Sequence, residues 1–121
     1  MPYIRSLPSK LEHIKLALDN QSLDILALNE TWLDDTIRDI DIEIQNYCIE
    51  RNDRNREGGG VAIYLNNTLT YKVRKDLNNP RIVSIWIEIK IHKSHKPLII
   101  CNIYIPTNSY AYYMEHFINV Y

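Results

Sequence analysis

Alternation between apolar and polar positions is the strongest pattern in the chain. Over residues 82–91 every second residue is apolar, and the members of this stripe are Val83, Ile85, Ile87, Ile89 and Ile91. Successive side chains of a strand point to opposite faces of a sheet, so the stripe predicts a half-exposed antiparallel strand.

Shorter apolar runs predict further strands at residues 23–28, 47–51, 61–65, 69–73 and 98–105. The runs at 23–28 and 98–105 have no polar alternation, which is typical of strands that are covered on both faces. Between residues 34 and 46, Ile40, Ile42 and Ile44 alternate with polar residues and favour an extended segment.

Helical spacing of apolar residues predicts two helices. Residues 9–20 place Leu11, Ile14 and Leu18 on one stripe, and Ser9 and Glu12 have the spacing of a capping box. Aromatic residues and a methionine recur at helical spacing over residues 110–121. The chain is therefore predicted to have a mixed α/β (α+β) layer fold, with about one mixed, largely antiparallel sheet and flanking helices.

Composition and charge narrow the class of protein. The 121 residues suffice for one domain, 45% of them are hydrophobic, and the net charge of −1 gives no overall attraction to nucleic acid. Cys48 and Cys101 each lie in an apolar run, where a free cysteine acts as a small hydrophobic residue. The first residues have no apolar core of a secretory signal, and no run of 18 apolar residues occurs. We therefore expect an intracellular protein without a membrane span, in the nucleus or the cytoplasm.

Glu30 is the first candidate for chemistry. It follows the apolar run of residues 23–28 in the stretch "LALNETWL". A carboxylate where a buried strand ends can face a cleft, and Mg²⁺ needs few protein carboxylates because it keeps several waters. On this stretch alone, Glu30 either binds a metal ion or simply ends the strand.

Two further stretches carry polar candidates. In "IYIPTNS", Tyr104 could donate its hydroxyl to a phosphate oxygen or lie at the edge of the core, and Asn108 can turn the chain. In "RNDRNREGGG", Arg51, Arg54 and Arg56 suit phosphate groups but equally suit a solvated hairpin tip. The glycines at 58–60 supply the left-handed backbone conformation that such a tip requires.

The order of these motifs resembles a known family. The series "RSL", "DILALNETWL", "YCIERNDR", "GGGVAIYL" and "IYIPTNS" is similar to the endonuclease/exonuclease/phosphatase (DNase I-like) superfamily. More narrowly, it resembles the N-terminal half of the endonuclease domain of non-LTR retrotransposon polyproteins, which also carry a reverse transcriptase.

The resemblance implies a Mg²⁺-dependent hydrolase that nicks DNA at a phosphodiester. It implies that Glu30 is a catalytic residue and binds Mg²⁺, and that Tyr104 is catalytic and helps to hold the scissile phosphate. Residues that would contact nucleic acid are Arg51, Arg54, Arg56 and Asn108.

The chain also departs from the family's pattern. Tyr3 stands where the family's first strand ends in a metal-supporting Asn, and the later Gly-Asp-Phe-Asn and Ser-Asp-His motifs do not occur. We therefore expect residues 1–121 to form one partial domain, truncated at the C-terminus and lacking the first strand. Such a chain lacks most catalytic residues of this family of phosphodiester hydrolases, so its Mg²⁺ binding should be weak or absent and the chain alone inactive.

A half-domain should also expose an apolar sheet face. The stripe between Val83 and Ile91 is a candidate for that face and for self-association. Two alternatives remain open: a non-catalytic relic or interaction module, and a phosphodiesterase of the same superfamily that acts on phospholipids or inositol phosphates.

Overall fold

The computed structural model describes residues 6–54, 58–91, 93 and 96–105. The helices in these ranges are α1 (Leu7–Gln21) and two short 3₁₀ helices, η1 (Asp39–Ile42) and η2 (Lys75–Leu77). The strands are β1 (Ile25–Asn29), β2 (Tyr47–Asn52), β3 (Val61–Asn66), β4 (Tyr71–Val73), β5 (Val83–Ile89) and β6 (Leu98–Tyr104).

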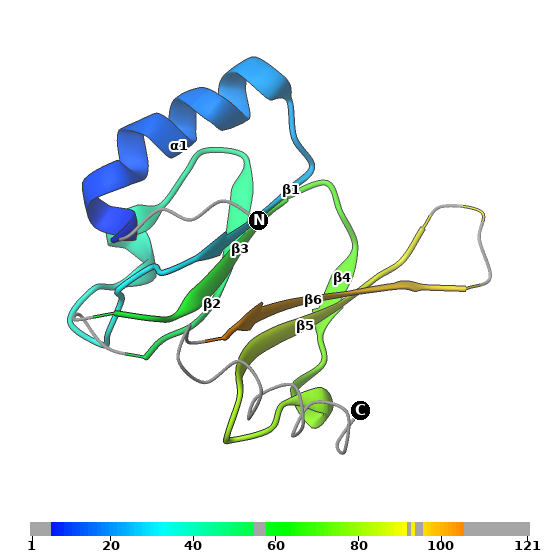
Figure 1. Cartoon of the computed structure of the whole chain (residues 1–121). Coiled ribbons are helices and arrows are strands. Elements are labelled where there is room, and N and C mark those ends of the chain that lie inside the picture. Colours follow the sequence, from blue (N-terminus) through cyan, green and yellow to red (C-terminus); the bar gives the residue numbers. More distant parts are fainter. Residues whose placement is uncertain (1–5, 55–57, 92, 94–95, 106–121) are drawn as a thin grey trace.

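The strands form two sheets of three. The first sheet has the order β1-β3-β2 and the second the order β4-β5-β6, and every pairing is antiparallel. Helix α1 lies over one face of the first sheet, and the second sheet lies on the other side (Figure 1). The predicted α/β class and the antiparallel pairing are confirmed, but the strands divide between two sheets where about one was expected.

The two sheets pack face to face, which corrects one expectation from the sequence. Ile85, Ile87 and Ile89 of the alternating stripe are buried against Val61 and Ile63 of β3. The stripe is therefore not an exposed apolar face, and self-association through it is not supported. The physical reason is that this chain contributes strands to both sheets, so it closes its own core between them.

A second core lies between α1 and the first sheet. It buries Leu7, Ile14 and Leu18 of the helix against Leu28 and Tyr64 of the sheet. Burial raises the pKa of the Tyr64 hydroxyl, which donates a hydrogen bond to the backbone oxygen of Ile42 (2.7 Å). Each face of the first sheet is thus covered by its own apolar layer.

The predicted helix is confirmed, although it begins earlier than the sequence suggested. Ser6 occupies the position before the first turn and Pro8 lies within that turn, where its fixed φ favours the start of a helix. Ser9 therefore lies inside the helix and donates its hydroxyl to the backbone oxygen of Ser6 (2.9 Å). The capping box predicted for Ser9 and Glu12 is wrong.

The segment between residues 34 and 46 also differs from its prediction. Residues 39–42 form η1 rather than extended backbone. Ile42 and Ile44 are buried in the core beside α1, while Ile40 is exposed. Alternation here reflects one turn of 3₁₀ helix followed by a bend, because Asp41 accepts a hydrogen bond from the backbone N–H of Arg38 (2.8 Å) and closes that turn.

Strand β6 is buried only along its second half. Leu98 and Ile99 are 44% and 41% exposed, and in the second half buried Asn102 and Tyr104 alternate with half-buried Cys101 and Ile103, so the prediction of a strand covered on both faces is wrong. The predicted helix at 110–121 lies outside the described residues. Within the described ranges, no helix is long and apolar enough to cross a membrane. Cys48 and Cys101 are free thiols.

Candidate functional site

Glu30 directly follows β1 and is buried. Only 6% of its surface is exposed. Its Oε2 accepts a hydrogen bond from the indole Nε1–H of Trp32 (2.7 Å) and another from the backbone N–H of Gly59 (3.2 Å). Two neutral donors therefore hold the carboxylate in a defined orientation, as a preorganised ligand requires.

The backbone around Glu30 is strained and pinned in place. Glu30 and Trp32 have φ values of 60° and 55°, in the left-handed region that residues other than glycine rarely adopt. Such conformations cost about 1–3 kcal/mol each and persist where the surroundings enforce them. Here Glu30 donates its N–H to the oxygen of Gly60, and Trp32 donates its N–H to the oxygen of Gly59, both at 3.0 Å.

The glycine segment explains why these two turns can approach each other. Gly59 and Gly60 have φ values of 75° and 89°, as the sequence led us to expect of this segment. A Cβ on Gly60 would lie 2.6 Å from the Oγ1 of Thr31, which is closer than real contacts allow. The backbone of the triplet therefore packs directly on the loop that carries Glu30.

Tyr104 ends β6 and lies beside Arg54. The Nη1 of Arg54 donates to the hydroxyl of Tyr104 at 3.4 Å, and the guanidinium carbon lies 5.6 Å from the centre of the ring. Arg54 also packs against Gly59, because a Cβ added to Gly59 would lie 2.4 Å from the Cδ of Arg54. We call Glu30, Trp32, Arg54, Gly59 and Tyr104 the Glu30 cluster, because contacts link them in series.

The two predicted site residues come from strands in different sheets. Asn29, at the end of β1, donates its side-chain N–H to the backbone oxygen of Ile103 at 3.2 Å. Glu30 and Tyr104 each follow one of these bonded residues directly. The structure therefore brings together the strand ends that carry Glu30 and Tyr104, 74 residues apart in the chain.

Sequence reasoning missed Trp32 and Gly59 as parts of the site. Both stood in motifs that had been singled out, "NETWL" and "GGGVAIYL". The missed signals were an indole N–H two residues after the carboxylate and a glycine backbone N–H outside the strand ladder, and spacing along the chain reveals neither contact with Glu30.

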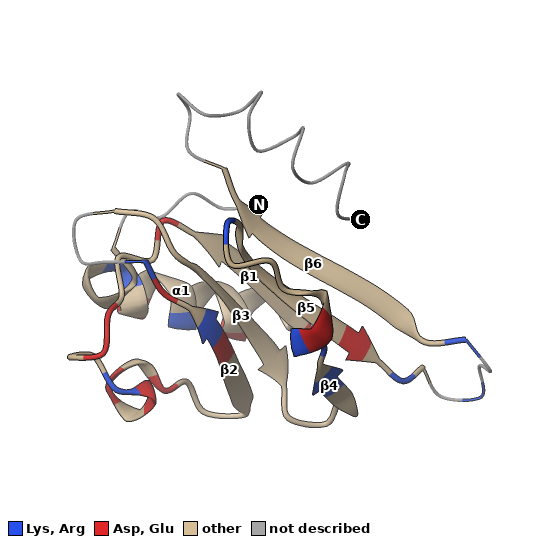
Figure 2. Ribbon diagram, turned by 90° about the horizontal axis from the view of Figure 1, so that it is seen from below, with Lys and Arg blue, Asp and Glu red and all other residues tan. Residues whose placement is uncertain are grey.

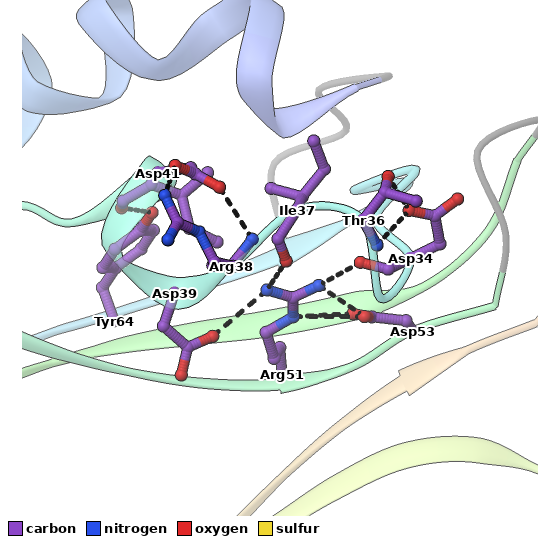
Figure 3. Close-up of polar contacts among 10 residues, drawn as sticks. Asp34, Thr36, Ile37, Arg38, Asp39, Asp41, Arg51, Asp53 and Tyr64 are labelled. Atoms are coloured by element: carbon purple, nitrogen blue, oxygen red, sulfur yellow. Dashed lines mark hydrogen bonds and ion pairs between the residues drawn. The ribbon is translucent and has the colours of Figure 1, made fainter.

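Arg51 lies on β2, and its donors are used within the chain (Figure 3). Its Nη2 lies 2.6 Å from Asp53 and its Nη1 3.1 Å from Asp39. The same two nitrogens donate to the backbone oxygens of Asp34 (2.8 Å) and Ile37 (2.7 Å). We call these five residues the Arg51 cluster, and its contacts tie the loop after β1 to β2.

The positive charge of Arg51 is offset by the carboxylates of Asp39 and Asp53. The hydrogen bond to Asp53 raises the pKa of the Arg51 guanidinium, and the side chain is only 14% exposed. A contact between Arg51 and nucleic acid stays a prediction that these contacts do not test. Arg56 and Asn108 lie outside the described residues.

Charge and metal chemistry limit what the site can do. Acidic and basic positions are interspersed over the described part of the molecule (Figure 2). The described residues contain no group of three or more His, Cys, Asp or Glu side chains that could surround a metal ion. Mg²⁺ is often held by one or two carboxylates, waters and a substrate phosphate, so Glu30 fits one ligand position and no complete shell.

Comparisons with known proteins identify the family of the chain and the relatives of its fold. Residues 3–119 match the model of the Endonuclease/Exonuclease/phosphatase family. The fold is similar to that of an AP endonuclease from Archaeoglobus fulgidus, with a TM-score of 0.69 and 19% sequence identity over 98% of this chain and 48% of that one. The chain thus spans about half the length of that structure. No curated protein matches the chain.

Proposed function

The chain belongs to the endonuclease/exonuclease/phosphatase family, and we propose that its Glu30 cluster is the metal- and phosphate-binding part of a site that hydrolyses phosphodiesters in DNA. The family comprises nuclease- and phosphatase-type hydrolases and is generally metal-dependent. The observation that carries the proposal is the series of contacts from Glu30 through Gly59 and Arg54 to Tyr104.

Each member of the cluster has a role that its surroundings support. The Glu30 carboxylate would be one ligand of Mg²⁺, which when bound would neutralise charge on the phosphate. The Tyr104 hydroxyl would donate to a phosphate oxygen, and the Arg54 guanidinium would hold a neighbouring oxygen. Trp32 and Gly59 would keep the carboxylate aimed at the metal through the hydrogen bonds already made to its Oε2.

These roles concern binding and orientation. Hydrolysis also needs a group that takes a proton from the attacking water and one that stabilises the leaving oxygen. Glu30 would hold the metal and Tyr104 would hold the phosphate, so the proton acceptor and the group that stabilises the leaving oxygen would have to be other residues. We therefore expect the 121-residue chain to bind a divalent metal and DNA weakly and to leave the DNA uncut.

A plasmid assay tests this expectation. The purified chain is incubated with supercoiled DNA and Mg²⁺, and nicked circles are measured against a Glu30→Ala variant. We expect equal, background levels of nicking for both proteins. Metal-dependent nicking that the Glu30→Ala change abolishes would show that the chain cleaves DNA by itself. It would contradict the proposal that these residues only bind and orient the metal and the phosphate.

We also propose the narrower origin, an endonuclease domain of a non-LTR retrotransposon. Its support is the joint occurrence of "NETWL" and "RNDRNREGGGVAIY" in one chain. The test is the nucleotide sequence after the codon for Tyr121. An in-frame or frameshifted Gly-Asp-Phe-Asn, then Ser-Asp-His and a reverse transcriptase are expected, and a continuation without any of these would refute the origin.

A further inference from the structure

Asn102 is a polar residue in a position that otherwise belongs to the apolar core. It lies on β6 between Ile100 and Tyr104, and these three residues share the face that packs toward the first sheet. Its partner across the second sheet is Ile85. The side chain is fully buried, with 0% exposure. A buried amide in such a place costs free energy where its polar atoms lack partners, and within the described residues the Oδ1 of Asn102 accepts no hydrogen bond.

Both donors of the Asn102 amide are bonded to the other sheet. Nδ2 donates to the backbone oxygen of Leu28 on β1 (3.0 Å) and to that of Ala62 on β3 (3.1 Å). Leu28 and Ala62 are themselves paired neighbours in the first sheet. One side chain of the second sheet is therefore hydrogen-bonded to two adjacent strands of the first sheet.

The same spacing leads from this point to Glu30 along β1, to Tyr104 along β6 and, along β3, to Gly60, whose backbone oxygen accepts the N–H of Glu30. Glu30 follows Leu28 by two residues, Tyr104 follows Asn102 by two residues, and Gly60 precedes Ala62 by two residues. Two residues of a strand span about 7 Å. The amide thus joins the strands one side-chain repeat away from Glu30 on β1 and Tyr104 on β6, and at the same distance along β3 from Gly60.

Two further asparagine amides reinforce this end of the molecule. Asn29 donates to the oxygen of Ile103, and Asn52 donates to the oxygen of Ser84 at 2.8 Å. Ser84 pairs with Ile103 in the second sheet, so both bridges lie at the end where β1 and β6 finish. Of the three amides, Asn102 is the one that contacts two strands at once.

We infer that Asn102 is a positioning residue, which sets the separation between Glu30 on the first sheet and Tyr104 on the second. The inference rests on the proposed function for its catalytic meaning, but its structural content can be measured without any reaction. In the hydrogen bonds described above, Asn102 contacts neither the carboxylate of Glu30 nor the hydroxyl of Tyr104.

The test compares Asn102→Leu, which keeps the volume and removes both donors, with Tyr64→Phe. The control removes a buried hydrogen bond from the opposite face of the first sheet, the one to Ile42. Two-dimensional ¹H–¹⁵N spectra report on the Glu30 cluster through the indole N–H of Trp32 and the backbone N–H of Gly59, both bonded to Oε2. Urea unfolding of both variants measures the loss of stability.

We expect Asn102→Leu to shift both reporter resonances and Tyr64→Phe to leave them in place at a comparable loss of stability. Unmoved reporters in a folded Asn102→Leu protein would overturn the inference. If Asn102→Leu does not fold, the inference is tested by hydrogen exchange of the Asn102 side-chain amide in the unmodified chain. Exchange as slow as that of buried backbone amides supports the inference, and exchange as fast as that of an exposed asparagine overturns it.

A metal titration separates this inference from the proposed function. Mn²⁺ is titrated into the unmodified chain and both variants, and its affinity is read from the broadening of the Gly59 resonance. We expect Asn102→Leu to weaken binding by about 10–100-fold, as changes to groups that orient ligands do. No broadening in the unmodified chain would refute metal binding by Glu30, while the reporter shifts would still decide the role of Asn102.

Discussion

Arg51 and Arg54 lie three residues apart at the same hairpin, yet their surroundings differ in kind. Arg51 is held by two carboxylates and two backbone oxygens, and its charge is balanced inside the chain. Arg54 lies over the ring of Tyr104 and bonds to a neutral hydroxyl. Within the described residues, Arg54 forms no ion pair with a carboxylate. The same residue type thus serves the fold in one place and remains suited to an external anion in the other.

The difference predicts opposite effects of mutation, and the largest is on stability. Arg51→Ala would leave Asp53 and two backbone oxygens without their donors. We expect the free energy of unfolding to fall by about 2–4 kcal/mol, toward the lower part of the range for buried pairs because Asp39 is exposed. Chemical denaturation monitored by tryptophan fluorescence measures the change.

Arg38→Ala is the matched control for that experiment. Arg38 pairs with Asp41 at 3.4 Å, but its side chain is 75% exposed. Exposed pairs contribute about 0–1 kcal/mol, so the control should scarcely change stability. Equal losses for the two arginines would mean that the Arg51 cluster does not stabilise the fold as its geometry indicates.

The next largest effect should come from the glycine segment of the Glu30 cluster. Gly60→Ala adds a Cβ that would lie 2.6 Å from Thr31 at a φ of 89°, so we expect a loss of about 1–3 kcal/mol. Gly58→Ala is the control, because its Cβ would meet ordinary contacts at 3.9 Å with Glu30 and Trp32. Thermal unfolding of both variants tests the difference, and a loss that is the same at both positions would argue against close packing at Gly60.

Arg54→Ala should change binding rather than folding. We expect a stability loss of less than about 1 kcal/mol, since Arg54 makes one long hydrogen bond and one ring contact. If Arg54 contacts a phosphate, the affinity for a fluorescent DNA duplex should fall by about tenfold and the salt dependence should become shallower. Fluorescence anisotropy at several salt concentrations measures both, with Arg38→Ala as the control. Unchanged DNA affinity would remove Arg54 from the proposed interface.

The last prediction concerns the chemical labelling of a thiol, and it involves neither a change of fold nor binding to DNA. Burial raises the pKa of Cys101 to about 12. Because this folded-state pKa lies above that of an unfolded cysteine, near 8.5, the buried thiol stabilises the fold below that value and loses this contribution as the pH rises toward 12. At pH 8 we expect Cys101 to react with iodoacetamide roughly a thousandfold more slowly than an unfolded cysteine. Peptide mapping by mass spectrometry measures the rate, and rapid labelling in the folded protein would contradict the prediction.

The two clusters also show what could be predicted from the sequence. The strand at residues 83–89 and the helix from residue 9 onward follow from periodicity, and motifs singled out Glu30 and Tyr104, which lie at the ends of β1 and β6. The alternating stripe showed that one face of β5 is apolar but not what covers it. Its partner is β3 of the same chain, about 20 residues earlier, and no local pattern encodes that pairing.

The finer parts of the site could not be predicted for a related reason. Arg51 and Arg54 look equivalent in "RNDRNR", and only the folded loop after β1 separates them. Asn102 looks like an irregularity in a buried strand until its amide is seen to reach Leu28 and Ala62, 74 and 40 residues away. Such roles depend on contacts between distant strands, which spacing along the chain does not determine.

The most direct test of the central claim is whether Glu30 binds a divalent metal beside Gly59. Mn²⁺ is added to the ¹⁵N-labelled chain and to Glu30→Gln, a variant that keeps the shape of the side chain and removes its charge. We predict that Mn²⁺ broadens the Gly59 amide and Trp32 indole resonances first, and that the broadening disappears in Glu30→Gln. Broadening that persists in the variant, or none in either protein, would contradict the assignment of this cluster to the family's metal-binding site.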